Sequence, residues 1–134
     1  MWKPLVREIP QRAMRLARAF WPGPLTIILP KSGLVPGVTT AGMDSVAVRM
    51  PSHEGARAVI AVTGLPIAAP SANLSGSPSP TTARHCIDDL WGKIPLILDG
   101  GECSVGIEST VVSLVGEPTL LRPGGISPGQ LEEA

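Results

Sequence analysis

The sequence predicts an α/β fold, with helices layered on a sheet that is parallel in part. Short apolar runs rich in Val, Ile and Leu alternate along the chain with helical segments, which is the pattern of layered α/β proteins. The 134 residues suit a single domain, and 43% of them are hydrophobic, enough for one core. Fifteen glycines and fifteen prolines indicate many turns between the elements.

The first predicted helix covers Pro10–Phe20, because apolar residues recur there at helical spacing and Pro22 and Pro24 follow. The residues expected to face the core are Ala13, Met14, Ala17 and Phe20. Three arginines recur every three residues along another face: Arg12, Arg15 and Arg18. A solvated face is one interpretation of this arginine stripe, and a contact with RNA is the other.

Apolar, β-prone runs predict the strands, and most of them are expected to be buried. The predicted strands are Leu25–Leu29, Ser45–Met50, Leu65–Ala69, Ile94–Leu98, Ser109–Val115 and Thr119–Arg122. The last two are joined by Gly116-Glu117-Pro118, which predicts a hairpin near the end of the chain.

Three further helices complete the prediction. One runs to Thr63, with Ser52 as its N-cap and Gly64 closing it. Another covers Thr81–Trp91, capped by Ser79 or Thr81, and a short one begins at Ser127. The Gly-rich segment 31–44 and the Pro- and Ser-rich segment 70–80 are expected to be loops.

Charge and composition exclude several classes of protein. Eleven basic residues balance eleven acidic ones, which argues against a protein built mainly to coat nucleic acid. Cys86 and Cys103 form no metal-ligand spacing and suit reduced thiols. No leader pattern opens the chain, and prolines and glycines break its longest uncharged run. We therefore expect a cytoplasmic protein without membrane association.

Polar side chains stand where predicted strands end, at Arg49, Ser71, Asn73, Asp99 and Arg122. Ligands of open α/β sheets bind outside strand ends, so these groups are expected to converge on one cleft. Two arginines suit an anionic ligand, because a guanidinium group grips a carboxylate or a phosphate with two parallel hydrogen bonds. The residues themselves predict a binding cleft and leave its substrate open.

Common catalytic motifs are absent from the sequence. It contains no Walker loop, no G-x-G-x-x-G and no G-x-S-x-G. His53 and His85 have no metal-ligand partner four residues away, so we expect no resident metal site.

Six segments resemble, in order, the signature motifs of the YrdC/Sua5 family. They are FWPGPLT (20–26), VAVRMP (46–51), APSANLSG (69–76), LDGG (98–101), GIESTVV (106–112) and LRPG (121–124). The resemblance implies a twisted mixed sheet flanked by helices, with a positively charged concave cavity. It also implies the activity of an L-threonylcarbamoyladenylate synthase, a nucleotidyltransferase that joins L-threonine, bicarbonate and ATP with Mg²⁺ and releases pyrophosphate. The product feeds the t6A modification of tRNA, carried out by downstream machinery.

The resemblance also assigns roles to residues of this chain. It implies that L-threonine is bound by Arg49, Ala69 and Ser109. It implies that ATP is bound by Ser45, Ser71, Asn73, Ser79 and Arg122. No residue is assigned as a covalent catalyst.

Each of these side chains has a structural alternative. In a purely structural role, Ser79 would cap the helix near Thr81, and Asn73 would form an Asx turn. Ser109 would be a small packing residue, and Arg49 a partner in a surface ion pair. The six motifs in family order favour the ligand roles over these alternatives.

The resemblance further implies that residues 1–134 are one YrdC-like domain that lacks its N-terminal third. Trp2-Lys3-Pro4-Leu5 resembles the segment just after the family's K-x-R motif, which binds the ATP phosphates. Two alternatives to an active synthase therefore stay open: a module that binds double-stranded RNA or a nucleotide, and an inactive fragment of a longer synthase.

Overall fold

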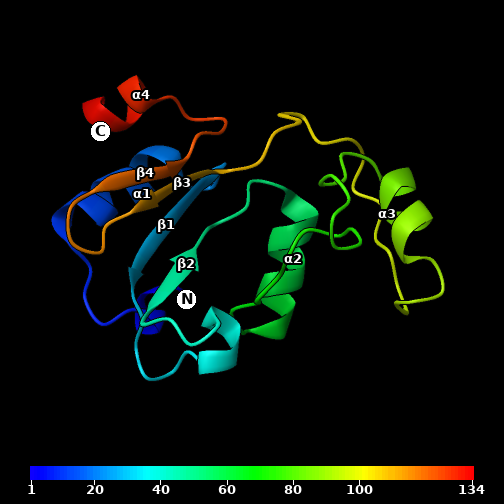
Figure 1. Ribbon diagram of the computed structural model, residues 1–134, viewed down its shortest axis with the longest axis horizontal. Helices are drawn as coiled ribbons and strands as arrows, with labels where there is room; N and C mark the ends of the chain where they lie inside the picture. The colour runs from blue at the N-terminus through cyan, green and yellow to red at the C-terminus, as the bar shows by residue number, and fades with distance from the viewer. The chain divides into compact units, whose positions relative to one another are not determined.

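The chain forms two compact units in a computed structural model that describes all residues, Met1–Ala134 (Figure 1). The first unit combines Met1–Ile67 with Ser109–Ala134, and the second is Ala68–Glu108. The single domain expected over residues 1–134 stays a prediction.

The first unit is built on a mixed four-stranded sheet. Its strands are β1 (Leu25–Pro30), β2 (Ser45–Val48), β3 (Thr110–Ser113) and β4 (Thr119–Arg122), in the spatial order β2-β1-β3-β4. Strand β1 pairs with β2 in antiparallel and with β3 in parallel orientation, and β3 and β4 form an antiparallel hairpin. The predicted mixed sheet and the hairpin are confirmed.

One face of β1 forms the centre of the core. Leu25, Ile27 and Leu29 are fully buried, whereas the residues between them are half-buried. The run LTIIL was expected to be buried on both sides, but only alternate residues face the core. Each buried aliphatic side chain contributes about 1.5–3 kcal/mol by leaving water.

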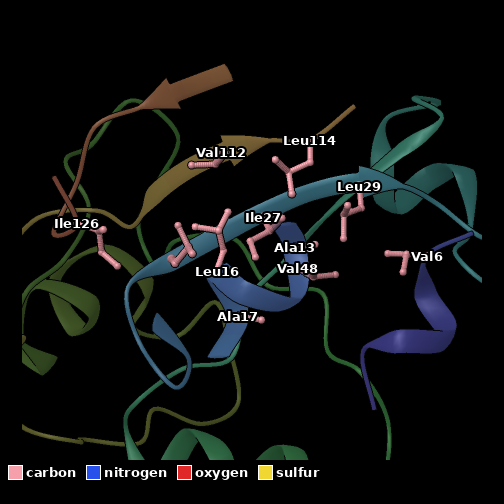
Figure 2. Close-up of a cluster of buried hydrophobic side chains, with 11 residues drawn as sticks. Val6, Ala13, Leu16, Ala17, Ile27, Leu29, Val48, Val112, Leu114 and Ile126 are labelled. Carbon is pink, nitrogen blue, oxygen red and sulfur yellow. The ribbon is translucent and has the colours of Figure 1, made fainter. Parts of the chain in front are cut away.

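Helix α1 (Gln11–Phe20) covers the core through Ala13, Leu16 and Ala17 (Figure 2). Figure 2 shows Leu16 reaching toward β1, with Val6 and Ile126 at opposite ends of the cluster. The helix was predicted correctly, but its buried face is rotated. Leu16, three residues after Ala13, is buried in place of Met14 and Phe20, which remain half-exposed.

The other helices begin at side-chain caps. Helix α2 (Glu54–Thr63) begins after His53, whose Nδ1 accepts from the Ala56 amide at 3.3 Å, so the N-cap predicted at Ser52 is wrong by one residue. Gly64 ends α2 in the left-handed conformation as predicted. In the second unit, helix α3 (Ala83–Leu90) is capped by Thr82 rather than by Ser79 or Thr81.

The C-terminal segment after β4 is anchored to the core. Helix α4 (Pro128–Glu133) begins with a reciprocal capping box between Ser127 and Gln130. Leu131 and Ala134 pack against the core cluster, and Arg15 donates to the Ala134 carbonyl oxygen at 3.0 Å. Two short 3-10 helices, Lys3–Leu5 and Gly37–Thr40, lie within the N-terminal segment and the predicted loop. No helix of the chain combines the length and the apolar composition that crossing a bilayer requires.

Two predicted strands are wrong. Residues 65–69 and 94–98 have no regular secondary structure, and Leu65 and Leu96 are 65% and 68% exposed. Neither segment has a strand beside it to complete its backbone hydrogen bonds, and an apolar run alone does not make a strand. Pro66 also removes one amide donor from the first of them.

The buried Thr110 hydroxyl joins β3 to the segment before α4. It donates to the Ile126 carbonyl and accepts from the Ile126 amide, both at 2.9 Å. Thr110→Val leaves both backbone groups without a partner, so we expect the free energy of unfolding to fall by about 1–3 kcal/mol. Urea denaturation measures this, with Thr119→Val as the matched control, because the Thr119 hydroxyl bonds only at the surface. Equal losses in the two variants would contradict the role of Thr110.

Candidate ligand-binding site

The strand register brings three of the predicted site residues to one end of the sheet. Parallel strands β1 and β3 begin at this end, and their antiparallel neighbours β2 and β4 finish there. Arg49 directly follows β2, Ser109 directly precedes β3, and Arg122 is the last residue of β4. The fold thereby places two guanidinium groups and a hydroxyl group, from distant parts of the sequence, at one end of the sheet.

Ser109 fixes the guanidinium group of Arg122. Arg122 Nε donates to the Ser109 carbonyl oxygen at 3.0 Å, and its Nη2 donates to Ser109 Oγ at 3.1 Å. Ser109 is only 7% exposed, and its hydroxyl also lies 2.8 Å from the hydroxyl of Thr26 on β1. Two hydrogen bonds to one residue define the plane of the guanidinium group.

Arg49 is held by backbone rather than by a carboxylate. Its Nε donates to the Gly23 carbonyl at 3.0 Å, and the Gly23 amide donates in turn to the Met50 carbonyl at 2.9 Å. No acidic side chain forms an ion pair with Arg49, which excludes the alternative of a surface ion pair. Partial burial, and then the positive charge of Arg122, hold the pKa of Arg49 below its ordinary value. An anion bound here would relieve that repulsion.

Gly23 is the residue that this turn requires. A Cβ atom at this position would overlap the Phe20 carbonyl oxygen. The turn is fixed further by Trp21, whose Nε1 donates to the Leu25 carbonyl at 2.7 Å and whose ring packs edge-on against Trp2. The FWPGPLT segment therefore forms a rigid support for Arg49.

Ser45 lies at the opposite end of β2, paired with Pro30. It borders an open depression of about 690 Å³, whose other lining residues are Arg7, Glu8, Pro30, Met43, Asp44 and Val115. Arg7 and Asp44 form an ion pair beside it. Within the first unit the structure thus does not bring Ser45 together with Arg49, Ser109 and Arg122.

The second unit carries Ala69, Ser71, Asn73 and Ser79. Ala69 and Ser71 are exposed in irregular backbone. Asn73 Nδ2 donates to the carbonyls of Leu74 and Ser77 at 2.8 and 2.9 Å, so Asn73 does shape the loop. Its Oδ1 is buried and has no hydrogen-bond partner.

Ser79 does not cap helix α3. Its hydroxyl donates to Glu108 Oε1 at 2.7 Å, which ties the Pro- and Ser-rich loop to the last residue of the second unit. No group of three His, Cys, Asp or Glu side chains lies close enough to hold a metal ion, and Cys86 and Cys103 are free thiols.

Two residues with a part in this site were missed by the sequence analysis, Thr26 and Gly23. Both lie within the FWPGPLT segment, but the pattern there indicated only a turn and a buried strand. Their contacts join residues 83 and 26 positions apart, so only the tertiary fold reveals them.

Comparison with known proteins identifies the family of this chain. The model of the Sua5/YciO/YrdC family, described as telomere recombination, matches residues 1–124. The chain belongs to this family. It is 56% identical over 130 residues to a threonylcarbamoyl-AMP synthase of Pyrococcus abyssi and 56% identical over 131 residues to one of Bacillus subtilis, covering 96% of this chain in both.

A solved structure of the Sua5/YciO/YrdC family also superposes closely. The crystal structure of P. abyssi Sua5 complexed with L-threonine is 55% identical, with a TM-score of 0.95, and the match covers 98% of this chain and 39% of that one. The chain spans about 38% of the length of the two synthases it matches. The fold expected from the resemblance, a mixed sheet with flanking helices that forms part of the family domain, is confirmed.

The turn that supports Arg49 gives a test of this geometry. Gly23→Ala forces the new methyl group against the Phe20 carbonyl, so we expect the free energy of unfolding to fall by about 1–3 kcal/mol. Gly33→Ala is the matched control, because a Cβ there meets nothing within 4 Å. Thermal and urea unfolding measure both variants. A Gly23→Ala protein as stable as the control would contradict the tight turn.

Proposed function

We propose that this chain serves threonylcarbamoyl-AMP synthesis, in which L-threonine, bicarbonate and ATP yield threonylcarbamoyl-AMP and pyrophosphate. The observation that carries the proposal is the backbone-held Arg49 beside the Ser109–Arg122 pair at one end of the sheet. Its support is the family membership and the relative that was crystallised with L-threonine.

In this proposal Arg49 holds the carboxylate of L-threonine. Its guanidinium group has no acidic partner in the chain, and positive charge from Arg122 favours an anion beside it. We further propose that Ser109 and the Ala69 backbone contact L-threonine, and that Ser71, Asn73, Ser79 and Arg122 contact ATP. Ser45, which lies at the other end of β2, would contact a different part of ATP from Arg122.

The proposed chemistry needs no covalent nucleophile. The amino group of L-threonine and bicarbonate form a carbamate with release of one water molecule. A carbamate oxygen then attacks the α-phosphate of ATP and expels pyrophosphate. The protein then contributes by positioning the reactants and by placing positive charge near the phosphates. No carboxylate cluster is present to hold Mg²⁺, so we propose that Mg²⁺ arrives on the phosphates of ATP and assign it no further step.

The product would pass to the machinery that forms t6A in tRNA. We propose the cytoplasm as the compartment, where ATP and tRNA are both available and where the free thiols Cys86 and Cys103 stay reduced.

The decisive assay is formation of threonylcarbamoyl-AMP from ATP, L-threonine and bicarbonate by the 134-residue chain. Arg49→Ala removes a charged hydrogen-bond donor, so we expect L-threonine binding to weaken at least about tenfold and threonine-dependent pyrophosphate release to fall with it. Arg18→Ala, on the exposed face of α1, is the control and should match the wild type. Unchanged turnover of Arg49→Ala would exclude its role.

Absence of product from the wild-type chain would favour a different proposal. The chain would then be an inactive part of a longer synthase, and calorimetric titration with L-threonine and with ATP would show which substrate it still binds.

A second candidate function is binding of double-stranded RNA, and the arginine stripe of α1 favours it. Arg12 and Arg18 are exposed and form neither ion pairs nor hydrogen bonds, whereas Arg15 bonds to the Ala134 carbonyl. The zero net charge of the chain counts against this candidate.

A salt titration of RNA affinity tests the arginine stripe. If it contacts phosphates, the affinity should fall steeply with salt, and replacing Arg12, Arg15 and Arg18 by Ala should reduce the log–log slope by roughly one per lost contact. Arg84→Ala, in the second unit, is the control. No binding of the wild type at low salt would exclude this function.

A further inference from the structure

We infer that Thr26 is a positioning residue, whose hydroxyl holds Ser109 so that the pair presents one O–H group to an anionic ligand beside Arg49. This inference deepens the proposed function and rests on it, because it assigns the donor for the carboxylate of an amino-acid substrate. Neither the strand pattern nor the family motifs give Thr26 such a role.

The sheet register places the two hydroxyl groups together. Thr26 lies on β1 opposite Val111 of β3, and Ser109 stands just before β3, on the neighbouring strand. Leu25 and Ile27 are fully buried against the core, so Thr26, which alternates with them, points to the opposite face of the sheet. The Thr26 and Ser109 oxygens are 2.8 Å apart, a full-strength hydrogen bond.

The hydrogen-bonding capacity of this pair can be counted. Each hydroxyl has one proton to donate and two lone pairs that accept. One Ser109 lone pair accepts from Arg122 Nη2 at 3.1 Å, and one proton is used between Ser109 and Thr26. If Thr26 donates, the Ser109 proton is left over, and if Ser109 donates, the Thr26 proton is left over. In either arrangement one hydroxyl proton has no acceptor within the protein.

The hydroxyl proton without an acceptor makes the site prefer a carboxylate ligand to a neutral one. A neutral donor next to a guanidinium group favours an acceptor, and the guanidinium group favours a negative charge, so a carboxylate satisfies both. A ligand that carries an amide in place of the carboxylate keeps the acceptor oxygen but loses the charge. The Thr26–Ser109 pair therefore discriminates most strongly between carboxylate ligands and their neutral analogues.

Binding of L-threonine and of L-threonine amide to the whole chain, measured by isothermal titration calorimetry, tests the inference. Thr26→Val keeps the β-branched shape and removes the hydroxyl, so the dissociation constant for L-threonine should rise about tenfold, the loss expected for a hydrogen bond to a charged group. The constant for the amide should rise only about threefold, because a hydrogen bond to a neutral acceptor is about half as strong as one to a charged acceptor. Thr26→Ser restores the hydroxyl and should restore most of the affinity.

Two further variants separate positioning from general damage to the fold. Thr119→Val makes the same substitution away from the site and should bind as the wild type does. In a Ser109→Ala background, Thr26→Val should add little, because the two residues act as a unit. If Thr26→Val fails to fold by thermal unfolding, Thr26→Ala provides the same comparison.

The outcomes distinguish this inference from the proposed function. Weak binding by Ser109→Ala with normal binding by Thr26→Val would overturn the inference alone. An equal loss for L-threonine and its amide in Thr26→Val would also overturn it, since that is the signature of a merely structural residue. Failure of the wild-type chain to bind L-threonine, or normal binding by both Arg49→Ala and Ser109→Ala, would overturn the proposed function and this inference with it.

Discussion

The parallel pairing of β1 with β3 is the constraint on which the first unit depends. It aligns Leu25 with Thr110, so that two strands from distant parts of the sequence begin at the same end of the sheet. Because β2 and β4 run antiparallel to these strands, their last residues arrive at that end as well. Arg49, Ser109 and Arg122 meet only through this arrangement, and the same pairing buries the aliphatic face on which α1 packs.

The site orients the guanidinium group of Arg49 without pairing it with a carboxylate. A carboxylate in the chain that paired with Arg49 would stabilise its charge but would compete with an anionic ligand. The Gly23 carbonyl instead supplies a neutral acceptor that orients the guanidinium group and leaves its charge uncompensated. Partial burial, and then repulsion from the nearby Arg122, lower the pKa of Arg49. An anion bound beside Arg49, as we propose for the carboxylate of L-threonine, would relieve this repulsion.

The second unit is organised differently, by polar contacts rather than by an apolar core. None of its residues is buried. Asn73 closes a loop through two backbone carbonyls, the Leu74 amide donates to Asp89, and Ser79 bonds to Glu108. Such a unit depends on hydrogen bonds that compete with water, so it should open locally at a lower free-energy cost than the sheet of the first unit.

By itself the sequence determined every α-helix of this protein to within a few residues, as well as the C-terminal hairpin and β1. These elements are set by local signals: apolar spacing, prolines and a capping box. It could not determine which apolar runs become strands, because residues 65–69 and 94–98 are as apolar as β1 and lack only a neighbouring strand. Arg49, Ser109 and Arg122 could be named as candidates from their motifs. Only the tertiary structure decided that Thr26 and Gly23 support them and that Ser45 lies at the other end of β2, since hydrogen bonds and strand register join residues that no local pattern relates.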